Sequence, residues 1–178
     1  MKKNILVFAI ICITVISSGC VGGNMLRDRD TERMKRNAEQ IINAINAKDT
    51  EILKNMFSVT ALSEATNLDE QIDTLFLYID GTLNVKYDNY GGSITGSHNK
   101  DGKPMQTIYK GFYSTDNGKQ YMICFLGYHG YENPDDDGIY MIKAVEGKYE
   151  KALNISMYSD VYAGIYVPTK EEIDSITK

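Results

Sequence analysis

The hydrophobic pattern of this chain changes near residue 82. Before that point, apolar residues recur at spacings of three and four, the period of amphipathic helices. After it, tyrosine, isoleucine and valine become frequent, and the interruptions are glycine, asparagine and aspartate, which is typical of strands and turns. A helical half followed by a strand-rich half predicts an α+β domain, with N-terminal helices packed on an antiparallel sheet.

Three helices are expected in the first half. The first covers roughly residues 31–48, where one stripe of apolar side chains recurs: Met34, Ala38, Ile41, Ile42 and Ile45. Asp49 or Thr50 is suited to cap a second, short helix, and a third begins near Asn67 and stops at Gly81. Near the C-terminus, the residues after Thr169 resemble a capping box, which predicts a last short helix.

Five strands are expected in the second half, near residues 82–90, 105–115, 119–130, 138–146 and 150–158. The Asn117-Gly118 pair separates two of them. Because Asn-Gly accepts the positive φ that a tight turn requires, it predicts a hairpin at this point.

The first twenty residues have the order of a secretion signal. Lys2 and Lys3 precede an uncharged run over residues 5–16, and small residues follow it up to Cys20. The run is too short to span a bilayer, which needs about 20 residues. Its end resembles the lipobox of bacterial lipoproteins, in which a diacylglyceryl group is attached to the cysteine, although Ser17 stands where that family usually has leucine.

This resemblance implies a signal peptide over residues 1–19, a lipidated Cys20 that begins a flexible tether over residues 20–30, and a single α+β domain over residues 31–178. It implies a cell-membrane protein, lipid-anchored and facing the extracytoplasmic side. Cleavage nearby without lipidation, which would release a soluble protein, is the alternative. Loss of Lys2 and Lys3 takes the formal net charge from −5 to −7, and such an acidic balance argues against a nucleic-acid partner.

The order of motifs resembles two nested families. Residues 42–58, a helix end followed by a short helix, resemble the opening of the nuclear transport factor 2-like (cystatin-like) α+β cone. Residues 68–72, 78–81 and 115–119 resemble motifs of an uncharacterised lipoprotein family of Gram-positive Firmicutes. The broad family implies helices packed on a curved antiparallel sheet that closes into a cone. The narrower family implies location and fold, but no activity.

Residues that could carry catalysis are few. Cys124 lies in an apolar strand, and only His98 and His129 could serve as bases. Cys124 and His129 are five residues apart, which places them on opposite faces of a strand. The acidic turn 133–138 offers calcium ligands, but Ala144 falls where an EF-hand needs glutamate. Two isolated histidines do not suggest zinc, so we expect no catalytic residue, no metal and no cofactor.

Tyrosine is the most suggestive component, with thirteen in the chain and no tryptophan. Six lie on the expected strands or the turn beside them: Tyr109, Tyr113, Tyr121, Tyr128, Tyr131 and Tyr140. Positions of the same parity share a strand face, so Tyr109, Tyr113, Tyr121 and His129 are the candidate residues for binding a small ligand or a protein partner in a concave face. Ordinary core packing of the tyrosines is the alternative. We expect a non-catalytic binding module of unknown specificity, with an enzyme using an acid–base site inside the cone as the alternative.

Overall fold

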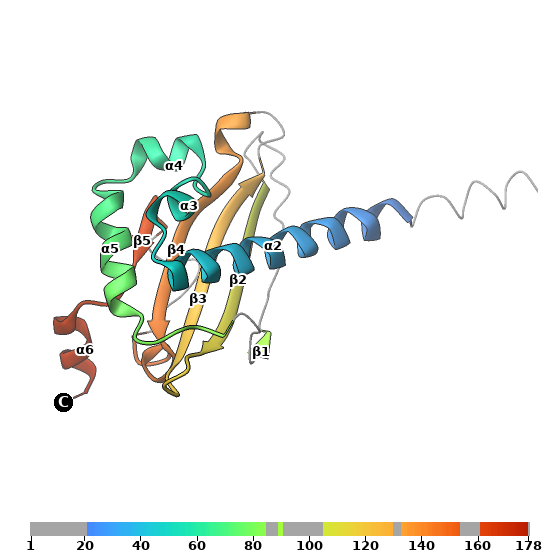
Figure 1. Ribbon diagram of the computed structural model, residues 1–178. Helices are drawn as coiled ribbons and strands as arrows, with labels where there is room; N and C mark the ends of the chain where they lie inside the picture. The colour runs from blue at the N-terminus through green and yellow to red at the C-terminus, as the bar shows by residue number, and fades with distance from the viewer. Residues whose placement is uncertain (1–20, 85–88, 91–104, 130–132, 154–160, 178) are drawn as a thin grey trace, which may run out of the picture. The chain divides into compact units, whose positions relative to one another are not determined.

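The computed structural model describes residues 21–84, 89–90, 105–129, 133–153 and 161–177 (Figure 1). The chain divides into two compact units, Met1–Arg36 and Asn37–Lys178, and each is described by itself. Cys20 and His98 lie outside the described residues, so the expectations that concern them remain predictions. Within the described residues, no helix is both long and apolar enough to cross a membrane.

Helix α2 (Val21–Ala47) begins earlier than expected. The segment 21–30, expected as a flexible tether, is helical. Although Gly22 and Gly23 disfavour a helix, the residues that follow include methionine, leucine and arginine, which have high helix propensity. An ion pair one turn apart, between Lys35 Nζ and Glu32 Oε1 at 3.1 Å, supports the same helix further along.

The part of α2 that belongs to the second unit has a buried apolar stripe. Ala38, Ile41, Ile42 and Ile45 are buried there, whereas Asn43 is exposed. The spacing of three and four residues therefore predicted the inward face correctly.

Three further helices follow: α3 (Thr50–Lys54), α4 (Val59–Glu64) and α5 (Leu68–Tyr78). Asp49 caps α3 by accepting a hydrogen bond from a backbone amide, as expected, and Ser58 caps α4 in the same way. Helix α4 was not expected, because it buries only one side chain, Ala61, and so shows no apolar stripe.

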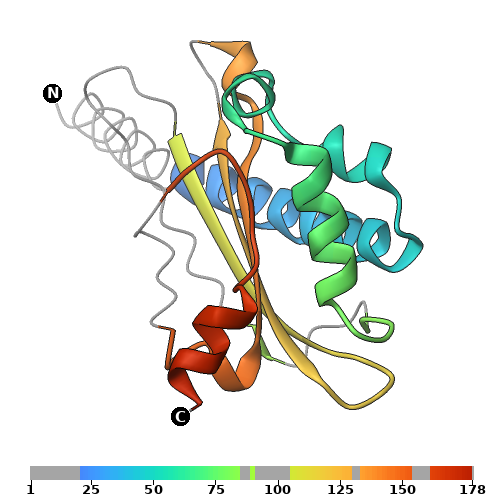
Figure 2. The same cartoon turned by 90° about the vertical axis from the view of Figure 1, so that its left-hand side faces the viewer.

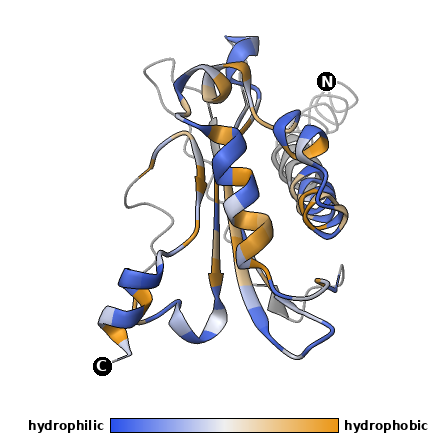
Figure 3. Cartoon of the chain, turned by 60° about the vertical axis from the view of Figure 1, so that its left-hand side comes forward, coloured by the Kyte–Doolittle hydropathy of each residue, from blue (hydrophilic) through white to orange (hydrophobic). Residues whose placement is uncertain are grey.

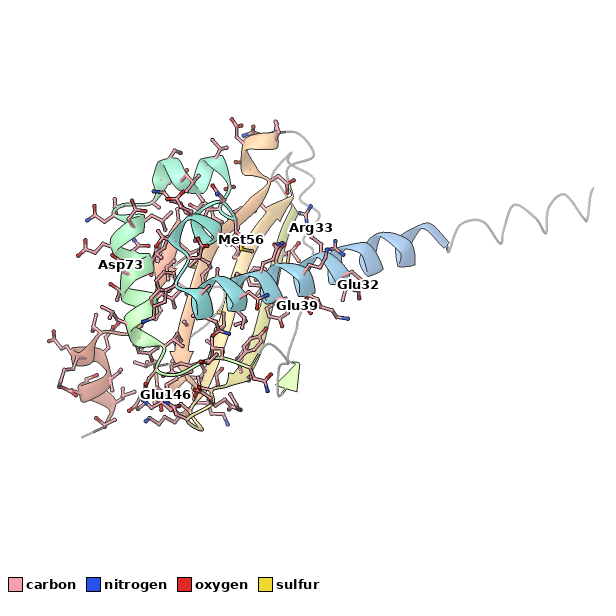
Figure 4. All side chains as sticks on the ribbon, in the orientation of Figure 1. Glu32, Arg33, Glu39, Met56, Asp73 and Glu146 are labelled. Atoms are coloured by element: carbon pink, nitrogen blue, oxygen red, sulfur yellow. The ribbon has the colours of Figure 1, made fainter. Side chains whose placement is uncertain are left out.

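Helix α5 contains both hydrophilic and hydrophobic residues, as the hydropathy colours of Figure 3 show. Its buried side chains are Leu68, Ile72, Leu75 and Phe76. Asp73 is exposed on the side away from the sheet (Figure 4). Helix α5 therefore packs through one face, as the pattern predicts.

The sheet has the strand order β1-β2-β3-β4-β5 among the described residues. The strands are β1 (Asn89–Tyr90), β2 (Met105–Ser114), β3 (Gln120–His129), β4 (Gly138–Glu146) and β5 (Gly164–Tyr166). Strands β1 to β4 pair antiparallel, and β5 is parallel to β4. Because β1 has only two residues, the body of the sheet is the mixed set β2 to β5. It is not strongly curled, unlike the curved sheet expected.

The expected hairpin is present, with Gly118 at φ 84° between β2 and β3. The strand expected at 150–158 is wrong over its described part: a 3-10 helix, η2 (Gly147–Tyr149), leads into a turn through residue 153. The rest of that range lies outside the described residues. The last strand is β5 instead, which needs a longer connection because it runs parallel to β4. Of the strand expected at 82–90, the structure describes a single bridge at Leu83 and the pair in β1.

Helices α3, α4 and α5 lie on one face of the sheet (Figure 2). The opposite face has its own apolar cluster, formed by Met122, Cys124 and Val145, with Tyr149 and Tyr166 packed against it. Helix α6 (Lys170–Ile176) follows β5, and its Thr169–Glu172 capping box is confirmed. Hydrogen bonds from Thr169 lower the pKa of the Glu172 carboxyl. The sheet is thus buried on both faces, which determines which of its side chains can reach a ligand.

Candidate functional site

Tyr109, Tyr113 and Tyr121 share one face of the sheet, as their parity predicts. Tyr113 lies directly opposite Tyr121 in the pairing of β2 with β3. That face is the one covered by helices, however, and all three side chains are buried, with at most 2% of their surface exposed. In this structure the three rings belong to the core. They offer no exposed surface that would support the prediction of a ligand site.

The contacts of these rings are internal. The hydroxyls of Tyr109 and Tyr113 lie 2.8 Å apart in a hydrogen bond, and the Tyr109 ring stacks on Phe125 with centroids 5.0 Å apart. Gly111 lies between the two tyrosines, and a Cβ there would come within 2.9 Å of the Tyr109 hydroxyl. The missing side chain therefore makes room for this hydrogen bond.

Tyr121 is tied to the end of α5 rather than to the other two. Its hydroxyl accepts a hydrogen bond from the Asp80 amide at 3.1 Å and donates to the Tyr78 carbonyl oxygen at 3.4 Å. The Tyr78 and Tyr121 rings meet edge to face at 5.8 Å. His129, the fourth predicted residue, ends β3 opposite Met105, and its side chain lies outside the described part of the chain.

Cys124 is a free, buried thiol, as expected for a small apolar residue in a core strand. It lies between Lys110 and Lys143 in the strand register. Burial raises its pKa to about 12, although the two lysine charges act in the opposite direction. Because the thiolate is the nucleophilic form, this thiol is unsuited to attack a substrate near neutral pH.

A different pair of tyrosines, Tyr128 and Tyr140, is partly exposed. Their rings meet edge to face with centroids 5.1 Å apart, and both pack against the cluster of Ile108, Leu126 and Met141. The pairing of β3 with β4 shifts between Leu126 and Gly127, and Tyr140 is the residue skipped by the shift. Irregularities of this kind redirect a side chain and often occur beside functional sites.

Two carboxylates adjoin the tyrosine pair. The Tyr140 hydroxyl donates a hydrogen bond to Glu64 Oε2, at the end of α4, at 2.6 Å. Asp136, in the 3-10 helix η1 (Pro134–Asp136), accepts a hydrogen bond from the Thr60 hydroxyl of α4. We call this set, Thr60, Glu64, Tyr128, Asp136 and Tyr140, the tyrosine–carboxylate surface.

The carboxylates act on both phenols. The hydrogen bond to Glu64, with some burial, raises the pKa of Tyr140 to about 12. Burial raises the pKa of Tyr128, and the charges of Glu64 and Asp136 add to that effect. Both phenols therefore stay protonated at neutral pH, so the surface presents two neutral rings beside two acidic side chains.

The sequence contains signals for this surface that periodicity alone does not reveal. Parity selected the odd-numbered tyrosines, and the register shift breaks parity where Tyr140 lies. Glu64 was missed together with α4, although Ser58 at its start is a good helix cap. The acidic turn was recognised, but only as a calcium candidate. Among the described residues, no group of three histidine, cysteine, aspartate or glutamate side chains could hold a metal ion.

The motifs at 78–81 and 115–119 form a structural link between α5 and the hairpin. Lys119 Nζ lies 2.6 Å from Asp80 Oδ2, and this contact lowers the pKa of Asp80. The Thr82 amide donates to Asp116 Oδ1 at 2.8 Å, across a Gly81 with φ 95°. These contacts fix the chain where it passes from helix to sheet, so both motifs have a structural explanation.

The chain matches a known protein family. A family model described as a domain of unknown function (DUF5104) matches residues 40–147, more than half of the chain and most of the second unit. No curated protein matches. The matched range includes α3, α4, α5 and strands β2 to β4, and with them all five residues of the tyrosine–carboxylate surface.

Proposed function

This chain belongs to the DUF5104 family, and we propose that it is a lipid-anchored extracytoplasmic protein whose second unit is a non-catalytic binding module. In this proposal, Cys20 carries the anchor and the tyrosine–carboxylate surface contacts a small ligand or a protein partner.

The anchor is supported by the sequence. Two lysines, an uncharged run and small residues precede Cys20, in the order of a lipoprotein signal. Two acyl chains give a stable anchor because each buried methylene contributes about 0.8 kcal/mol, whereas one chain is marginal. The helix that begins at Val21 then follows the anchor directly.

The fold we propose in finer detail is the nuclear transport factor 2-like arrangement. Its support is the order of elements, a long helix followed by short helices and then an antiparallel set of strands, with helices on one face of the sheet. The sheet, which is not strongly curled, and the parallel β5 differ from a cone. A ligand would therefore bind at the surface of the molecule and not inside a cone.

The observation that carries the binding proposal is the contrast among the tyrosines. Tyr128 and Tyr140 are partly exposed and their neighbours are acidic, while Tyr109, Tyr113 and Tyr121 are buried. Partly exposed tyrosines combine an apolar ring with a polar tip, which suits them to recognition. The buried Cys124 thiol, with its pKa near 12, favours binding over nucleophilic catalysis.

Two measurements on the full chain test the proposal. Expressed in a Gram-positive host with labelled palmitate, the chain should incorporate label and remain with the membrane, and Cys20→Ser should do neither. Labelling of Cys20→Ser would contradict the anchor.

For the binding module, the chain is screened against cell-wall fragments, peptides and small metabolites, with melting temperature and product formation followed together. A stabilising ligand that stays chemically unchanged, and whose effect is lost in Tyr128→Leu, supports the proposal. A ligand that is consumed, with consumption lost in His129→Gln, would favour the enzyme instead.

A further inference from the structure

The segments that form the tyrosine–carboxylate surface have an unusual charge distribution. Residues 55–85 and 120–142 contain no lysine or arginine, although both stretches contain several acidic residues. Helix α4 packs on η1 and on β4, so the two stretches meet at this surface. Asp135 and Asp137 flank Asp136 and are exposed. Among the described residues of these two stretches, the charged side chains are therefore all acidic.

The two carboxylates at the rings form hydrogen bonds with uncharged groups. Glu64 accepts from the Tyr140 phenol, and Asp136 accepts from the Thr60 hydroxyl and the Asn133 amide. No ion pair that we find among the described residues includes Glu64 or Asp136. Within the described part of the chain, neither carboxylate is therefore paired with a lysine or arginine, so each can interact with a positive group that approaches from solvent.

The rings add a second attraction for the same kind of group. The faces of aromatic rings attract cations, most strongly ammonium and guanidinium groups of side chains or ligands. In this molecule the Lys148 ammonium already lies 4.7 Å from the Tyr149 ring centroid, and Lys110 lies 5.4 Å from that of Phe112. At Tyr128 and Tyr140 the rings are partly exposed, and carboxylates lie beside them.

We propose that the tyrosine–carboxylate surface binds an organic cation, an alkylammonium or guanidinium group, between the Tyr128 and Tyr140 rings and the carboxylates of Glu64 and Asp136. The inference rests on the proposed function and specifies the chemistry of its ligand. Such a group occurs both in basic peptides and in polyamines, and the experiment distinguishes these two sources.

The test uses the full chain in detergent micelles, with tetralysine, spermidine and neutral tetraalanine as probes in titration calorimetry. Tetralysine or spermidine should bind, and tetraalanine should not. Tyr128→Leu keeps an apolar side chain but removes the ring, and should weaken binding roughly three- to fivefold. Glu64→Gln should weaken it by roughly two- to fivefold. The probe that binds more tightly identifies the source of the cationic group: tetralysine indicates a basic peptide, and spermidine indicates a polyamine.

Matched controls lie elsewhere on the second unit. Glu70→Gln removes an exposed carboxylate from α5, and Tyr162→Leu removes a tyrosine that is 37% exposed. Both should leave cation binding unchanged. Equal losses in control and site variants would overturn the inference, as would calcium displacing tetralysine in a manner that depends on Glu64. Binding of a neutral ligand that is lost in Tyr128→Leu would overturn the cation inference alone and leave the binding module in place.

Discussion

Two tyrosine pairs on one sheet, Tyr109 with Tyr113 and Tyr128 with Tyr140, differ in the partners of their hydroxyls. In the first pair the two hydroxyls bond to each other beneath the helices. In the second pair Tyr140 bonds to a carboxylate, and both rings are partly exposed. A residue type that is common in strands therefore has two environments here. Burial and hydrogen-bond partner distinguish them, whereas abundance does not.

The largest expected difference between the pairs is in stability. Tyr109→Ala removes a buried ring that stacks on Phe125, and should lower the free energy of unfolding by about 3–5 kcal/mol. Tyr140→Ala removes a partly exposed ring and should cost about 1 kcal/mol. Urea denaturation of both variants, monitored by circular dichroism, measures the difference. Equal losses would mean that the two pairs are buried alike.

A smaller difference is expected when only the hydroxyl is removed. Tyr109→Phe deletes the buried hydrogen bond to Tyr113 and should cost about 1 kcal/mol. Tyr140→Phe removes a hydroxyl at the surface, where water can solvate Glu64, and should change stability by less than about 0.5 kcal/mol. Urea denaturation measures this difference as well. A greater loss of stability in Tyr140→Phe than in Tyr109→Phe would mean that the Tyr140 hydroxyl, and not the Tyr109 hydroxyl, is the structural one.

The smallest effect is confined to alkaline pH. The pKa of Tyr140 is raised from 10.0 to about 12 in the folded chain. Between these values the folded state holds a proton that the unfolded state has released. The contribution of Tyr140 to stability is therefore complete below pH 10 and is lost as the pH rises through about 12.

The phenolate absorbance near 295 nm, compared between the wild type and Tyr140→Phe, isolates this titration. Removing the carboxylate in Glu64→Gln should bring the pKa of Tyr140 back toward 10, since the hydrogen bond to Glu64 is its largest cause. Glu70→Gln should leave it unchanged. An unaltered Tyr140 pKa in Glu64→Gln would show that Glu64 does not accept the hydrogen bond from the Tyr140 phenol.

The helices could be predicted where they bury an apolar face over several turns. Ile41, Ile42 and Ile45 in α2, and Ile72, Leu75 and Phe76 in α5, lie inward as their spacing requires. The hairpin could be predicted because the Asn117-Gly118 pair favours the positive φ that a tight turn requires. Helix α4 buries a single side chain and so shows no apolar stripe. Strand β5 has three residues and depends on a parallel pairing that local sequence does not specify.

The candidate site could be predicted only in part. Parity placed Tyr109, Tyr113 and Tyr121 on one face correctly, but it cannot say which face the helices cover. Tyr140 depends on a register shift, and Glu64 comes from a helix far away in the sequence, so their contact is a tertiary property. Composition could have pointed to the surface through the absence of basic residues from 55–85 and 120–142.

In our proposal, Tyr128 and Tyr140 form the accessible recognition surface, whereas Tyr109 and Tyr113 are structural. Hydroxyl-radical footprinting of the full chain, read by mass spectrometry, tests it most directly because it reports solvent access at each ring. We expect rapid oxidation of Tyr128 and Tyr140 that tetralysine suppresses, with Tyr109 and Tyr113 oxidised only after denaturation. Oxidation of Tyr109 and Tyr113 in the native protein as fast as that of Tyr128 and Tyr140 would contradict it.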